Sequence, residues 1–454
     1  MKKLNHIKVL FMILCQLSIV SHQLSIARAQ HIWTYDECIQ YAIDNNIDMK
    51  QKAVDIEMQK NQLNTTENDW LPSVNVVAAQ RFSFGNAFAS TGTMASSNKV
   101  YNADLSYTNA TADLEMPVFD GFRRKNQKLA DHWSVQQATA SLLYARKALT
   151  IQMATYYLQA LYERGMMEVA QTQVETSRQL CEKTKTLVDD GRNPKSDLAD
   201  AEAQLAADEY ELTEAQGRYK IALLTLSQLL NLETVEGFDI ADITEDPSTL
   251  HPPLDLWSLA RQEPSTIEQY PSIVAGKALV EKNRYDIETA RAGYYPKVDF
   301  RASLNTYYLN FFHESHPDGF GAQWWNNKSE VVGLHLTIPV FDRFSTRNNI
   351  RKAKMAHTKS QLALEDSRQQ LRKEMDQAYY NALNAQSKYA SAKKSEEASQ
   401  LSCAYEKDKY EAGRSTLYDL TQANQRLKKA REDAVQAKYE NIIRRKILEV
   451  YVGQ

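Results

Sequence analysis

The sequence predicts an α+β membrane protein in which four strands per chain contribute to a β-barrel and long helices form a coiled coil. Three observations lead to this class: an internal repeat, two very long runs free of proline, and four segments in which apolar and polar residues alternate. The repeat relates the other two, because each copy contains one long run and two alternating segments.

The internal repeat is clearest at positions 116–122 (MPVFDGF), which recur at positions 338–344 as IPVFDRF. The same shift along the chain relates Gly191 to Gly413. This period is far longer than the roughly 20–50 residues of a solenoid repeat. We therefore predict two copies of one unit, each with a helix, two strands, a very long helix and a return helix. The copies occupy positions 30–232 and 265–454, and a proline-containing linker joins them at 233–264.

The N-terminal segment, positions 1–29, has the pattern of a secretory signal peptide. Lys2, Lys3 and Lys8 precede an apolar core at 9–20, and Ala-Arg-Ala at 27–29 is a suitable cleavage site. Cleavage would remove 4 of the 54 basic residues and none of the 57 acidic ones, leaving a net charge of 54 − 4 − 57 = −7. This negative balance disfavours nucleic acid as a partner.

A helix is expected at positions 34–68. Thr34 and Glu37 have the spacing of a capping box at its start. The segment ends at Trp-Leu-Pro, positions 70–72, where the first strand should begin. Positions 269–293 are expected to take the part of this helix in the second copy.

Four segments alternate between apolar and polar residues and are expected to be strands: 73–85, 109–116, 298–312 and 332–338. In a soluble sandwich the apolar face would be a core, whereas in an outer-membrane barrel it would face lipid. The signal peptide and the charged polar faces favour the barrel. Because four strands cannot close a barrel and lipid does not tolerate an open sheet edge, several chains are expected to share one barrel.

The repeated Pro-Val-Phe-Asp motif is expected to mark the junction between each second strand and a long helix. Pro117 and Pro339 lack the backbone N–H that continued strand pairing would use, so each should end its strand. Asp120 and Asp342 are placed to cap the incoming helix.

The two long helices are expected at positions 122–190 and 344–412, since neither run contains a proline. At 1.5 Å per residue such a helix is about 100 Å long, which excludes a compact domain. Gly191 and Gly413 are expected to stop these helices. Return helices should follow at 195–232 and 415–449, with Asn193 as the cap of the first and Thr416-x-x-Asp419 as the cap of the second. Each return helix has a seven-residue apolar step typical of a coiled-coil seam, at Leu198, Leu205, Leu212 and Tyr219, and at Leu420, Leu427 and Ala434.

The sequence shows no constellation of catalytic residues. There is no nucleophile with a matching base, no phosphate-binding loop and no metal-ligand spacing among the histidines and cysteines, so neither a cofactor nor a metal is expected. We predict that the protein is not an enzyme.

Taken in order, these motifs resemble the TolC family of outer-membrane efflux proteins over essentially the whole mature chain. The resemblance implies a homotrimer, in which three chains of four strands make a twelve-stranded barrel embedded in outer-membrane lipid. The helices would continue as a tunnel of roughly 100 Å across the periplasm. The implied activity is passive conduction, as the exit duct of a tripartite efflux pump or a type I secretion system. The implied partners are a periplasmic adaptor and an inner-membrane pump.

The resemblance also implies a periplasmic gate at the hairpin turns. Asp419 matches a gate aspartate, whereas the second gate position is occupied by Gln422. Tyr410 matches a latch tyrosine, Arg414 lies one residue before the latch arginine position, and Asp197 is the expected carboxylate partner. The alternative for Asp419 and Asp197 is that both only complement the helix dipole as first-turn residues.

A different class of function competes with the duct. A soluble periplasmic coiled-coil scaffold or adaptor would use the same helices, with its strands packed as a sandwich. Extraction without detergent and the absence of a pore would distinguish it from a duct.

Overall fold

The computed structural model describes residues 32–88, 100–102, 104–243, 264–312 and 318–452. The expected signal peptide at 1–29 lies outside these residues, as does most of the proline-containing part of the linker. Within them the chain divides into two compact units. The sheet unit comprises Val54–Ala140 and Ser272–Ser367; the helical unit comprises the described residues of Met1–Ala53, Ser141–Pro271 and Arg368–Gln454.

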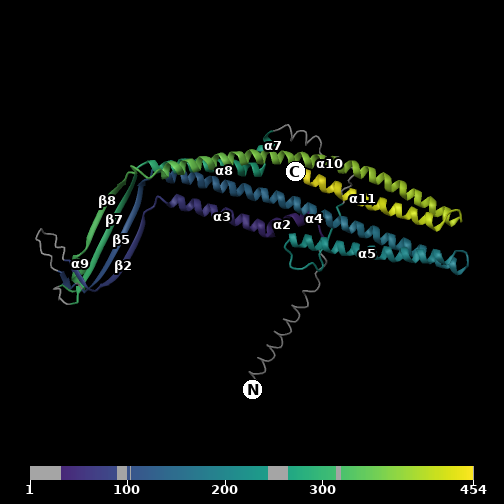
Figure 1. Ribbon diagram of the computed structural model, residues 1–454, viewed down its shortest axis with the longest axis horizontal. Helices are drawn as coiled ribbons and strands as arrows, with labels where there is room; N and C mark the ends of the chain where they lie inside the picture. The colour runs from purple at the N-terminus through teal and green to yellow at the C-terminus, as the bar shows by residue number, and fades with distance from the viewer. Residues whose placement is uncertain (1–31, 89–99, 103, 244–263, 313–317, 453–454) are drawn as a thin grey trace, which may run out of the picture. The chain divides into compact units, whose positions relative to one another are not determined.

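The sheet unit contains one antiparallel four-stranded sheet with the spatial order β2-β5-β7-β8, as Figure 1 shows. The central pair joins the first sequence repeat to the second. The four strands are β2 (Ser73–Ser83), β5 (Leu105–Phe119), β7 (Lys297–Phe311) and β8 (Ser329–Thr337). A small hairpin, β3 (Asn86–Phe88) with β4 (Val100–Asn102), and the short helix α9 (Phe320–Asn326) complete the strand region.

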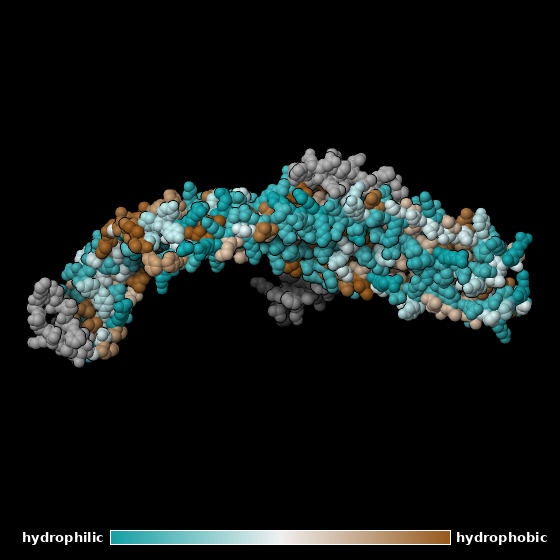
Figure 2. All heavy atoms as spheres, turned by 45° about the horizontal axis from the view of Figure 1, so that its top comes forward, coloured by the Kyte–Doolittle hydropathy of each residue, from teal (hydrophilic) through white to brown (hydrophobic). Residues whose placement is uncertain are grey.

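The register aligns one apolar row across all four strands. Val74 pairs with Leu114, Leu114 with Ala302, and Ala302 with Val332. The neighbouring row is polar, and in it Glu115 and Arg301 form a cross-strand ion pair with an N–O distance of 2.9 Å. Apolar side chains along β2 and β8 are exposed rather than covered by another element. In Figure 2 hydrophobic surface, in brown, accordingly gathers around the strands.

The two strand-to-helix junctions differ in how the strand ends. β8 ends at Thr337, two residues before Pro339, as expected. β5 instead continues through Pro117 to Phe119, with a register shift against β7 between these two residues. The prediction that Pro117 ends its strand was therefore wrong. A bulge accommodates the missing N–H, since an extra residue interrupts the ladder at that point.

Both junctions turn the chain with two consecutive residues at positive φ. These are Gly121 (φ 69°) and Phe122 (φ 65°) in the first copy, and Arg343 (φ 57°) and Phe344 (φ 64°) in the second. The Asp120 carboxylate accepts a hydrogen bond from the backbone N–H of Arg124 at 3.1 Å. In the same way, Asp342 accepts one from the backbone N–H of Thr346 at 2.7 Å. Each aspartate thus satisfies a first-turn donor of its long helix.

The first helical segment is divided rather than continuous. It forms α2 (Tyr35–Asn45) and α3 (Ile47–Asn68), and Asn46 between them has an extended backbone with ψ 134°. The Asn46 side chain accepts from the N–H of Asp48 and donates to the carbonyl of Leu229. The single helix predicted over 34–68 was wrong at this residue, because a contact far away in sequence stabilises the break. The capping box of Thr34 and Glu37 is present.

The long helices match their predicted ranges to within one residue at each end. They are α4 (Arg123–Asp189) and α10 (Ser345–Glu411), 67 residues each. The return helices are α5 (Lys195–Leu229) and α11 (Leu417–Val452). In the second copy α7 (Pro264–Gln269), α8 (Pro271–Arg291) and the short 3₁₀ helix η1 (Ala292–Tyr294) precede β7. Figure 1 shows α4 beside α5 and α10 beside α11, and these pairs are called the first and second hairpin.

The core of the helical unit lies around Tyr157 of α4, which is fully buried. Its hydroxyl lies 2.7 Å from the carbonyl oxygen of Ala241 and 3.0 Å from that of Trp33. These carbonyls flank a two-stranded parallel sheet of β1 (Ile32–Trp33) and β6 (Asp239–Ile240). β6 lies inside the segment 233–264 that was expected to be a linker, so part of this segment is a strand. The partner of β6 is β1, which lies at the start of the first sequence copy. The residue pattern within the linker could not reveal this pairing.

Candidate functional site

The candidate site is the pair of hairpin turns in the helical unit. α4 ends with Gly191 at φ 69° and α10 with Gly413 at φ 70°. The N–H of Arg192 donates to the carbonyl of Leu187 at 2.8 Å, and that of Arg414 donates to the carbonyl of Lys409 at 2.8 Å. This is the hydrogen bond of a Schellman motif. The residue at positive φ in this motif is usually glycine, because glycine has no Cβ to clash in the left-handed conformation. The two turns are therefore built in the same way.

Asp419 caps the start of α11 together with Thr416, the residue directly before the helix. Its carboxylate accepts from the N–H of Thr416 at 3.2 Å and from the Thr416 hydroxyl at 2.6 Å, and its own N–H donates back to that hydroxyl at 3.2 Å. The hydrogen bonds from Thr416 lower the pKa of Asp419 below its ordinary value. Asp419 is exposed and remains anionic, so the capping contacts leave its charge available at the turn.

A second carboxylate lies at the same turn. Glu406 accepts a short hydrogen bond from the Ser415 hydroxyl, and the Lys409 ammonium is within 2.9 Å of it. The hydrogen bonds from Ser415 and Lys409 lower the pKa of Glu406. The second hairpin turn therefore presents two anionic groups, of which the sequence pointed only to Asp419.

The cap of α5 differs from the prediction. Pro194, not Asn193, occupies the cap position, and it makes no side-chain cap hydrogen bond. The Asn193 amide instead donates to the Asp197 carboxylate at 3.1 Å. The proline side chain has no hydrogen-bond acceptor, so it cannot cap the helix. Asn193 bonds to the side chain of Asp197 instead of to a backbone N–H of the first turn.

Within the described part of one chain, no side-chain hydrogen bond or ion pair joins the expected latch residues Tyr410, Arg414 and Asp197 to one another. The Tyr410 hydroxyl is buried and has no hydrogen-bond partner there, while its ring lies 5.7 Å from the ammonium of Lys183. Lys183 also pairs with Glu411 at 3.1 Å. For the Arg414 guanidinium no ion pair is found among the same residues.

A cleft of about 1210 Å³ separates the two hairpins near their turns. Tyr410 and Asp197 both line it, from the second and the first hairpin respectively. Ser177 and Gln204 also line it, and both bond the buried carboxylate of Asp208. The cleft is thus bounded by the turns and by a polar network.

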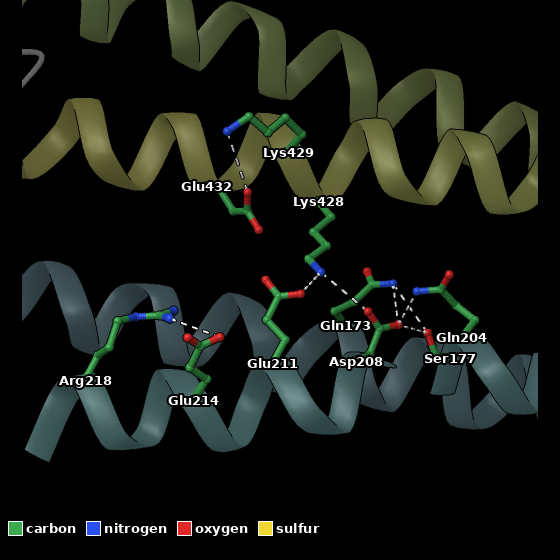
Figure 3. A network of polar contacts seen from close by, with 10 residues as sticks. All are labelled: Gln173, Ser177, Gln204, Asp208, Glu211, Glu214, Arg218, Lys428, Lys429 and Glu432. Carbon is green, nitrogen blue, oxygen red and sulfur yellow. Dashed lines mark hydrogen bonds and ion pairs between the residues drawn. The ribbon is translucent and has the colours of Figure 1, made fainter. Parts of the chain in front are cut away.

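Sequence reasoning missed this network, which Figure 3 shows. Lys428 of α11 reaches Asp208 and Glu211 of α5. One signal was available: Asp208 lies seven residues from Ala201 and from Ala215, both buried, so a charged residue occupies a seam position. Its partner could not be identified, because 220 residues separate Asp208 from Lys428.

Within the described residues, no group of three or more histidine, cysteine, aspartate or glutamate side chains could hold a metal ion. No helix that the structure describes combines the length and apolar content needed to cross a bilayer.

Known proteins share both the sequence pattern and the fold. The family model described as "Outer membrane efflux protein" matches residues 38–232 and 264–454. The chain is 21% identical over 354 residues to the alkaline protease secretion protein AprF of Pseudomonas aeruginosa, covering 76% of this chain and 69% of that protein. It is 25% identical to the outer membrane protein OprJ of the same organism, covering 69% of this chain and 62% of OprJ. The crystal structure of the Campylobacter jejuni CmeC outer membrane channel superposes with a TM-score of 0.77 at 15% identity, covering 92% of this chain and 85% of CmeC.

These matches confirm the family predicted from the repeated junctions and turns, the fold class and the outer-membrane localisation. They also support the role of an exit duct for efflux or secretion over that of a soluble scaffold. Two matched segments, one in each sequence copy, together cover most of the chain, and the fold around them is that of a solved outer membrane channel. The chain belongs to the outer membrane efflux protein family.

Proposed function

We propose that three copies of this chain assemble into a passive exit duct that works with a periplasmic adaptor and an inner-membrane pump. One observation carries this: the sheet has a bare apolar face and ends at β2 and β8, which have no further partner strand among the described residues. Lipid does not tolerate unpaired backbone groups at a sheet edge. Pairing β2 of one copy with β8 of the next satisfies both edges and leaves the apolar face toward lipid.

Three sheets of four strands give a closed barrel of twelve, an even number that such barrels favour. The polar row that includes Glu115 and Arg301 then faces the lumen. The long helices α4 and α10 form the periplasmic tunnel. Each of the three chains contributes both of its sequence repeats, 30–232 and 265–454, to this tunnel. No group in this arrangement needs to react with cargo, which agrees with a duct rather than an enzyme.

The hairpin turns form the gate at the periplasmic end of the tunnel. Three copies of Asp419 concentrate negative potential in a narrow throat, which favours cations. Tyr410, Arg414 and Asp197 act as the latch between neighbouring hairpins. The buried Tyr410 hydroxyl supports this role, since it lacks a partner within one described chain. Positions 190–198 and 412–420 are the surface that the adaptor contacts.

The deciding experiment is single-channel recording from detergent-purified protein in a planar bilayer, with the molar mass measured on the same sample. A trimer with a small, cation-selective and mostly closed conductance is expected. A monomer that stays soluble without detergent and gives no conductance would overturn the proposal. The family description names efflux, and one relative is named for protease secretion. Export of small molecules and export of secreted proteins should therefore both be assayed in the producing cells.

A further inference from the structure

Asp208 is a charged side chain inside the seam between helices. It is 2% exposed. One carboxylate oxygen, Oδ2, accepts from the Ser177 hydroxyl at 2.5 Å and from the Gln173 and Gln204 amides at 3.2 and 3.1 Å. Burying a carboxylate in this way is unfavourable unless it is hydrogen-bonded and paired with a cation. The three donors come from the first hairpin itself, and the cation must come from elsewhere.

The cation is Lys428 of the second hairpin. Its ammonium lies 3.4 Å from Oδ1 of Asp208 and forms a shorter contact with Glu211, and its side chain is 10% exposed. Burial lowers the pKa of Lys428, but the hydrogen bonds and charges of Glu211 and Asp208 outweigh this and raise it overall. Lys428 therefore stays charged, and a single side chain of α11 is bound to two carboxylates of α5 (Figure 3).

The network lies at a similar distance from the turns in each helix. Ser177 is 191 − 177 = 14 residues before Gly191, Asp208 is 208 − 194 = 14 residues after Pro194, and Lys428 is 428 − 416 = 12 residues after Thr416. At 3.6 residues per turn these separations are roughly three to four helical turns. Because Ser177 and Gln204 also line the cleft, the network closes the end of the cleft that is remote from the turns.

A second ion pair joins the hairpins nearer the turns, but it is a weaker connection. Lys183 and Glu411 are each about half-exposed, and pairs of that kind contribute little to stability. Removing one partner of a buried pair is far more disruptive, because the other charge stays buried without compensation. The network around Lys428 is consequently the stronger of these two ionic links between the hairpins.

We infer that Lys428, with Asp208 and Glu211, is a clamp that limits how far the two hairpins can separate. Between the clamp and the turns the hairpins enclose a cleft and are joined by the weaker contacts of Lys183 with Glu411 and Tyr410, so they separate there more easily; beyond the clamp they stay packed. Lys428 is a positioning residue for the gate, and this role rests on the proposed duct function. Loss of the clamp extends the mobile part of both hairpins and favours the open duct.

The test compares Lys428→Met with Lys429→Met in the full-length, detergent-purified protein. Lys429 is the matched control, because its side chain is 68% exposed and its ion pairs, with Glu432 and Asp433, lie within α11. Hydrogen exchange followed by mass spectrometry reports on positions 195–207 and 414–427. Lys428→Met should accelerate exchange there roughly tenfold, since opening then costs less free energy, whereas Lys429→Met should match the unchanged protein.

Single-channel recording supplies the functional readout. Lys428→Met should raise the fraction of time spent open several-fold, and Lys428→Arg, which keeps the charge, should restore most of the closed behaviour. Glu211→Gln should act in the same direction with a smaller effect, and Glu211 is 37% exposed, so this variant should fold even where Lys428→Met does not.

Equal exchange in Lys428→Met and Lys429→Met, or unchanged exchange in folded Glu211→Gln, would overturn the clamp. Exchange requires no conductance, so the two proposals can fail separately. An unmodified protein that never conducts refutes the duct, whereas a conducting protein with unaltered exchange in the variants refutes only the clamp.

Discussion

Replacing Gly121 by alanine should destabilise the strand-to-helix junction of the first copy. Gly121 has φ 69°, and a Cβ at this position would lie 2.7 Å from the Cβ of Tyr295 and 2.8 Å from the carbonyl oxygen of Ala292. An alanine with left-handed backbone costs about 1–2 kcal/mol. Relieving the overlap with a backbone oxygen costs about 1–3 kcal/mol more, because no flexible side chain can move aside. The expected loss is therefore about 2–5 kcal/mol in the free energy of unfolding.

The second copy offers the matched control. Arg343 stands where Gly121 stands in the first copy and already has φ 57° with an exposed side chain. Arg343→Ala adds no new Cβ, so its effect should stay within about 0.5 kcal/mol. Denaturant unfolding in detergent, followed by circular dichroism, measures both variants against the unchanged protein. Equal unfolding midpoints for Gly121→Ala and Arg343→Ala would refute the steric argument.

Three further predictions concern the gate and the core. Asp419→Ala should weaken block of the conductance by polyvalent cations added from the periplasmic side; unchanged block would leave Asp419 with its capping role alone. The pKa of Asp419 is depressed below its ordinary value of 3.8, so its cap and its charge are present above that pH and are lost only as pH falls through the lower folded value. Cation selectivity measured by reversal potential should accordingly persist at pH 4, and its loss near pH 5 would contradict the assignment. Tyr157→Phe should cost about 1–3 kcal/mol, because the carbonyls of Trp33 and Ala241 lose a buried donor; an unfolding midpoint equal to that of the unchanged protein would contradict this.

Much of the fold was accessible from the sequence because it depends on local chemistry. The ranges of α4 and α10 follow from the absence of proline over 67-residue helices. The capping box at Thr34 and the stops at Gly191 and Gly413 act through hydrogen bonds that span only a few residues. Alternation identified the strands, since side chains on neighbouring residues must point to opposite faces.

Parts of the candidate site were accessible for the same reason. Asp419 follows from the spacing of Thr416-x-x-Asp419, and its capping bonds lie within that segment. The prediction of Asn193 as a cap failed although it was local, because Pro194 occupies the cap position and the Asn193 amide bonds to Asp197.

The order of the elements, their lengths and the chemistry of each helix end follow from the amino-acid sequence. Which distant residues meet is visible only in the folded chain: Asn46 with Leu229, β1 with β6, and Lys428 with Asp208. The physical reason is that periodicity and capping reflect the energy of a few consecutive residues. The burial of a charge such as Asp208 depends on which helix face packs against it, and that is settled only when the whole chain has folded.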